Sequence, residues 1–139
     1  ESGADNIGIV VIFRADGAVK NPAIYHTESG EFTKVGYLDN DFIMSSGQYV
    51  IINTYTGKKN AYLLDGVTQA EIENHKDNYG VIDWDTVIEK YGTVINEYLD
   101  EDGEFIQLQD GTNTLTYTAD EGTNYLSVSV YYRISYLGV

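Results

Sequence analysis

The clearest pattern in the chain is an alternation of apolar and polar residues from Leu126 to Tyr136. One set of alternate positions is apolar or aromatic and comprises Leu126, Val128, Val130, Tyr132, Ile134 and Tyr136. The positions between them are Ser127, Ser129, Tyr131, Arg133 and Ser135. Successive side chains of a strand point to opposite faces, so the pattern predicts a long strand with the first set in the core. We expect the domain to end on this strand.

Several other segments have the character of strands. Residues 7–14 (IGIVVIFR) are apolar on both faces, which is typical of a buried strand. Residues 47–54 (GQYVIINT) predict a central strand, and residues 55–59 (YTGKK) predict a hairpin that leads to a returning strand in residues 60–66 (NAYLLDG). Shorter strands are expected within residues 21–26, 30–38, 104–109 and 110–118.

The spacing becomes helical between Val67 and Gly92. Thr68 and Glu71 have the spacing of a capping box, which predicts the start of a short helix. A second helix is predicted because four apolar side chains share one helical face, namely Trp84, Val87, Ile88 and Tyr91. Gly92 is placed to end it. We therefore expect residues 1–139 to form a single all-β, mainly antiparallel β-sandwich or jelly roll, with a helical insertion at approximately residues 67–92.

The composition excludes several classes of protein. A chain of 139 residues with 42% hydrophobic residues is long enough for one core, and no apolar run has the length of a membrane span. With 22 acidic and 8 basic residues the formal charge is −14, which disfavours nucleic acid as a partner. The absence of cysteine excludes disulfides and thiolate metal sites. The 13 tyrosines suit either a sheet surface or a recognition surface.

No candidate active site stands out. His26 and His75 have no sequence-local partner at metal spacing, so we expect surface or loop histidines. Residues 99–104 (LDEDGE) are acidic but lack the frame of a calcium loop, which favours an acidic turn. Among the 22 acids no pair is singled out for glycoside hydrolysis, and no nucleophile elbow or phosphate loop occurs. We therefore predict no catalytic, cofactor-binding or metal-binding residue, and no enzyme activity.

Short motifs occur in a fixed order across most of the chain. They consist of Asn21 and Pro22; Ser29, Gly30 and Glu31; Gly47 through Thr54; Phe105, Leu108, Gly111 and Asn113; and Tyr132, Arg133, Tyr136 and Gly138. In this combination the chain resembles the C-terminal domain of siphophage distal tail proteins, the phage tail component family of phages and prophages of Gram-positive bacteria. Two features depart from the family pattern: the helical insertion, and the absence of the family's N-terminal ring domain.

The resemblance implies a galectin-like β-sandwich in the virion, at the tail tip or baseplate. The family protein joins the tail tube to tail-tip and receptor-binding proteins, so the implied function is structural and acts through protein–protein contacts. The full-length protein is then expected to be a hexamer, whereas the isolated domain is expected to be a monomer. Tyr131 and Arg133, on the solvent face of the last strand, are one candidate contact surface, because both residue types are enriched in interfaces. Ordinary exposed strand residues would have the same appearance.

Two alternatives come from other classes of protein. A tyrosine-rich β-sandwich is also typical of a carbohydrate-binding module, which would recognise a host-surface glycan, although a galectin-type sugar-binding signature is lacking. A bacterial surface-adhesin repeat is the third option. Such repeats carry Lys–Asn isopeptide bonds, and the final strand after Asn124 offers no Asn.

Overall fold

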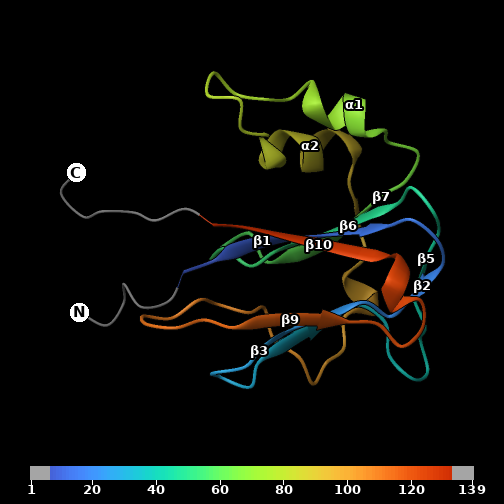
Figure 1. Cartoon of the computed structure of the whole chain (residues 1–139), viewed down its shortest axis with the longest axis vertical. Helices are drawn as coiled ribbons and strands as arrows, with labels where there is room; N and C mark the ends of the chain where they lie inside the picture. The colour runs from blue at the N-terminus through green and yellow to red at the C-terminus, as the bar shows by residue number, and fades with distance from the viewer. Residues whose placement is uncertain (1–6, 133–139) are drawn as a thin grey trace.

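The computed structural model describes residues 7–132, and in it two antiparallel sheets face one another (Figure 1). The larger sheet has the order β10-β1-β6-β7-β8, formed by β10 (Leu126–Tyr132), β1 (Ile9–Ala15), β6 (Tyr49–Asn53), β7 (Asn60–Leu64) and β8 (Thr93–Val94). The smaller sheet has the order β4-β3-β9, formed by β4 (Phe32–Lys34), β3 (Ala23–His26) and β9 (Leu115–Thr118). β2 (Val19–Lys20) and β5 (Ile43–Met44) form a separate pair. The predicted all-β, mainly antiparallel sandwich is confirmed.

The helical insertion covers the outer face of the five-stranded sheet (Figure 1). It contains α1 (Gln69–Glu73) and α2 (Trp84–Tyr91). The short 3-10 helices η2 (Asn96–Tyr98) and η3 (Thr123–Tyr125) lie elsewhere in the described residues. The predicted capping box is present, with Thr68 and Glu71 each accepting from the other's backbone N–H. Gly92 follows α2 with an extended φ of −83°, so the helix ends there without a left-handed glycine. No helix among residues 7–132 is long and apolar enough to span a membrane.

The five-stranded sheet is buried on both faces, which explains the unbroken apolar run of β1. Ile9, Val11 and Phe13 contribute to the core between the two sheets, whereas Val10 and Ile12 contribute to a second core under the helices. β6 follows the same rule, with alternate residues divided between the two cores. In α2, Val87 and Ile88 are buried in the second core, and Trp84 and Tyr91 pack against it as predicted. A third layer of helices therefore converts one sheet face from solvent-exposed to buried.

β10 is an edge strand, which corrects part of its predicted burial. Leu126 is buried and Val128 and Val130 are half-buried against the core, as the alternation predicts. Tyr132 is 54% exposed, so its predicted place in the core is wrong. Among the described residues β10 pairs with β1 alone, and an edge strand is covered less completely than a central one. Arg133, Ile134 and Tyr136 lie outside the described residues.

Residues 104–109 do not form the predicted strand. Ile106 and Leu108 are buried, but one isolated bridge, Ile7 to Leu108, is the only ladder pairing recorded in this part of the described chain. Glu104 N–H also donates to the Phe32 carbonyl, and side chains take part in further bonds. Ile106 N–H donates to Thr33 Oγ1 at 3.4 Å, and Gln107 Nε2 donates to the Thr54 carbonyl at 2.6 Å. The apolar spacing predicted the burial of this segment, but not its irregular backbone.

Candidate functional site

His26 is buried, so its predicted surface position is wrong. Its side chain has no exposed area, and its two ring nitrogens lie 2.6 Å from Ser29 Oγ and 2.7 Å from Asn113 Oδ1. Glu28 lies beside this group and accepts the Thr114 backbone N–H at 2.7 Å. This bond holds the pKa of the Glu28 carboxyl below its usual value, and the Thr114 hydroxyl adds to the effect. The turn after β3 is thus attached to the loop before β9.

Ser29, His26 and Asn113 have the contact order of a nucleophile, a base and an orienting group. Ser29 Oγ also accepts the Glu31 backbone N–H at 3.1 Å, and Ser29 N–H approaches His26 Nδ1 at 3.3 Å. These are bonds of a tight turn, and the two hollows described below contain neither His26 nor Ser29. The geometry therefore supports a structural connection between two loops, which sequence reasoning missed because its partners are 87 residues apart.

His26→Ala should lower the free energy of unfolding by about 2–3 kcal/mol, because it removes a fully buried side chain together with its hydrogen bonds to Ser29 and Asn113. Denaturant unfolding of the purified domain measures this change. The control is His75→Ala, at a partly exposed loop position, where we expect a change within about 1 kcal/mol. Equal effects of the two substitutions would contradict the role assigned to His26.

Asn21 is the centre of a second buried polar cluster. It has a positive φ of 53° and is 1% exposed. Its Oδ1 accepts the Phe42 backbone N–H at 2.7 Å, and its Nδ2 donates to Asp41 at 2.9 Å and to Asp120 at 2.8 Å. The pKa of the Asp120 carboxyl is lowered by the Asn21 bond first and by Lys34 next. Gly36 is needed beside this cluster, because a Cβ there would lie 1.8 Å from Asn21 Oδ1.

The acidic segment at residues 99–104 forms a turn against β4. Gly103 N–H donates to the Asp100 carbonyl at 3.0 Å, and Asp102 N–H donates to the Asp100 carboxylate at 2.9 Å. Asp100 N–H and Glu104 N–H donate to the carbonyls of Lys34 and Phe32. In the part of the chain that the structure describes, no group of three or more His, Asp or Glu side chains is placed to hold a metal ion.

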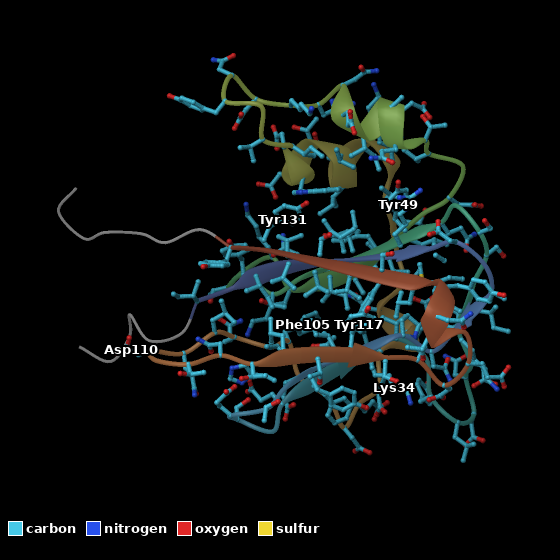
Figure 2. The ribbon with its side chains drawn as sticks, viewed as in Figure 1. Lys34, Tyr49, Phe105, Asp110, Tyr117 and Tyr131 are labelled. Carbon is cyan, nitrogen blue, oxygen red and sulfur yellow. The ribbon has the colours of Figure 1, made fainter. Side chains whose placement is uncertain are left out.

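A pocket of about 580 Å³ lies between the helical insertion and the five-stranded sheet. Four separate segments form it: β1, the β6–β7 hairpin, the α1–α2 loop with the start of α2, and the end of β10. Its aromatic side chains are Tyr55, Trp84, Tyr131 and Tyr132. The ring centroids of Trp84 and Tyr131 lie 5.7 Å apart, and Figure 2 shows Tyr131 on the helix side of the sheet. We call this hollow the aromatic pocket.

Charged side chains stand around the aromatic pocket. Asp77, Asp83, Asp85 and Lys58 line it, so acidic groups outnumber basic ones. Lys58 forms an ion pair with Asp85 at 3.4 Å. Asp83 caps α2 through Thr86, whose side-chain and backbone hydrogen bonds lower the pKa of the Asp83 carboxyl. Tyr131, the described member of the predicted contact pair, belongs to this pocket, whereas Arg133 lies outside the described residues.

A second hollow, of about 450 Å³, lies between the edge strands of the two sheets. Leu115 of β9 and Val130 and Tyr132 of β10 line it together with the loop that contains Asp110 and Gly111. Figure 2 shows Phe105 and Tyr117 between the two sheets, and Tyr117 is 47% exposed. The flank formed by β9 and β10 therefore presents partly exposed apolar side chains. We call it the β9–β10 flank.

The strand order places the chain in a general class, the antiparallel β-sandwiches, here with helices packed on one outer face. Comparisons with models of protein families, with curated proteins and with solved structures find no significant match. Inferences about function consequently depend on the residues of this chain and on the ordered motifs within it.

Proposed function

We propose that this chain is a structural module of the distal tail of a phage or prophage of a Gram-positive bacterium. It lies at the tail tip or baseplate of the virion and acts without catalysis, through contacts with tail-tube and tail-tip proteins. The observation that carries the proposal is the ordered set of motifs along most of the chain. In the isolated state the domain is a monomer, and hexamer formation depends on the N-terminal ring domain of the family.

The positions of the motif residues support a structural role. Asn21 holds the segment before β5 through the Phe42 N–H, and Ser29 and Asn113 bind opposite sides of buried His26. Gly111, which precedes β9, has a positive φ of 91° as a turn glycine requires. These motif residues therefore stabilise loops and turns, which supports a structural role.

The β9–β10 flank supports a role in protein contacts. β9 (LTYT) and β10 (LSVSVYY) lie at the edges of their sheets, and within the described part of the chain neither contains a charged residue or proline. Soluble proteins usually protect an edge strand with charges, proline or a bulge, because its unpaired backbone groups accept another strand. In a chain with 22% charged residues, two neutral edges beside one hollow favour contact with a partner chain.

Gold-labelled antibody against this domain should bind the distal tip of tailed particles from the bacterium that carries the gene. Electron microscopy of intact particles measures the position of the label. Particles assembled with Ser129→Lys, which adds a charge to the β10 edge, should contain at least about tenfold less of the protein. Ser46→Lys, in an exposed loop, is the matched control. Label on another part of the particle, or on no particle, would contradict the proposal.

Recognition of a host-surface glycan remains the second candidate function. One observation favours it, the row of aromatic rings along the aromatic pocket, since such rings stack on sugars. A glycan array with the purified domain tests it, and Tyr131→Ala should abolish any binding that uses this pocket. Binding that persists unchanged in Tyr131→Ala would exclude the pocket as the glycan site.

A further inference from the structure

The aromatic pocket has two properties that point to the same ligand chemistry. Its volume of about 580 Å³ lies within the range of small-molecule sites, and aromatic side chains come from the β6–β7 hairpin, α2 and β10. The faces of aromatic rings carry negative potential, which attracts cations. The aromatic rings that line the pocket therefore favour a cation, even without the charged side chains.

The formal charges act in the same direction. Lys58 is the one basic residue of the described lining, and its ion pair with Asp85 offsets one carboxylate. Neither Asp77 nor Asp83 forms an ion pair with a basic side chain of the described lining, so the lining keeps a net negative charge. Asp77 uses Oδ1 to accept the N–H groups of Tyr79 at 2.8 Å and Val81 at 3.0 Å. No bond to Asp77 Oδ2 is recorded among residues 7–132, so this oxygen can accept from a ligand.

We propose that the aromatic pocket binds an alkylammonium group, with Trp84 and Tyr131 contacting the cation through their rings and Asp77 supplying the opposite charge. The ammonium belongs either to a lysine side chain of a partner protein or to a quaternary ammonium compound such as choline. A neutral sugar would gain from the rings but not from the carboxylates. The inference is independent of the tail-tip proposal, because it rests on the pocket alone.

The helical insertion acquires a role from this proposal. The α1–α2 loop supplies Asp77, and α2 supplies Trp84, while the sheet supplies Tyr131. Neither part forms the pocket alone. The insertion thus adds a ligand site to a sandwich whose other flank is available for protein contacts.

Trp84 is the single tryptophan of the chain, so its fluorescence reports directly on the pocket. Titration of the full chain with choline should change Trp84 emission saturably over the millimolar range, at constant ionic strength. The neutral isostere 3,3-dimethyl-1-butanol has the same shape without the charge and should bind at least about fivefold more weakly. A second titration uses N-acetyl-lysine methylamide, which carries a primary ammonium group. Tighter binding of this compound than of choline indicates a lysine side chain as the ligand, and tighter binding of choline indicates a quaternary ammonium compound.

Variants test the named residues. Tyr131→Leu keeps an apolar side chain but removes the ring face, and Asp77→Asn removes the charge; each should weaken choline binding by about threefold or more. Lys58→Ala should strengthen it, because a like charge is removed. Tyr117→Leu, on the β9–β10 flank, should leave binding unchanged. Equal binding of choline and its neutral isostere, no binding of either cation, or tighter binding of a neutral glycan would overturn the proposal.

Discussion

Asn21→Asp should lower the free energy of unfolding at neutral pH by about 2–4 kcal/mol, although the two side chains have nearly the same shape. The substitution removes the Nδ2 donor that bonds Asp41 and Asp120, and it places a third carboxylate between them. Denaturant unfolding of the wild type and the variant measures the difference. Asn124→Asp adds the same charge at an exposed position and should change stability by at most about 0.5 kcal/mol.

The pH dependence of Asn21→Asp has a defined sign. In the wild type the pKa of Asp120 is lowered on folding, so its stabilisation is present at neutral pH and is lost as the pH falls through that lowered pKa. In the variant, three neighbouring carboxylates take up protons more readily in the folded state, which relieves their repulsion. The stability difference should therefore narrow as the pH is lowered. A difference that is constant or widens in acid would contradict this account of the cluster.

Phe13→Ala should destabilise the domain by about 3–5 kcal/mol, because the ring is fully buried between the sheets and its loss leaves a cavity. Thermal and denaturant unfolding measure the effect. Val130→Ala is the comparison variant, since Val130 is half-buried on the edge strand β10. This substitution should lower the free energy of unfolding by about 1 kcal/mol. Similar losses in the two variants would mean that β10 is as central to the fold as β1.

Local interactions made much of the fold predictable. The capping box of Thr68 and Glu71 and the apolar face of α2 depend on residues three or four positions apart, so the sequence displays them directly. β1 and β6 were predictable for a related reason, because strand pleating assigns alternate residues to opposite faces. The irregular backbone of residues 104–109 could not be predicted in this way. Their apolar spacing indicated burial, but their bonds to Thr33 and Thr54 depend on distant parts of the chain.

The candidate sites required long-range information. His26 has a local partner in Ser29, but its other partner, Asn113, is 87 residues away and is brought beside it by the pairing of β3 with β9. The aromatic pocket combines residues from Val10 to Tyr132, so no window of the sequence contains it. Trp84 and Tyr131 were each visible in the sequence, one as a helix residue and one as a candidate contact residue. Their proximity was not.

The sequence by itself determined the secondary structure of the main elements and the class of the fold, because periodicity and caps act between near neighbours. Only the tertiary structure decided which strands lie at edges, which face of the larger sheet the helices cover, and which polar residues are buried together. These properties depend on strand order and on contacts between distant residues. The exposure of Tyr132 shows the difference, since its alternation predicted the core and its place at the end of an edge strand left it in solvent.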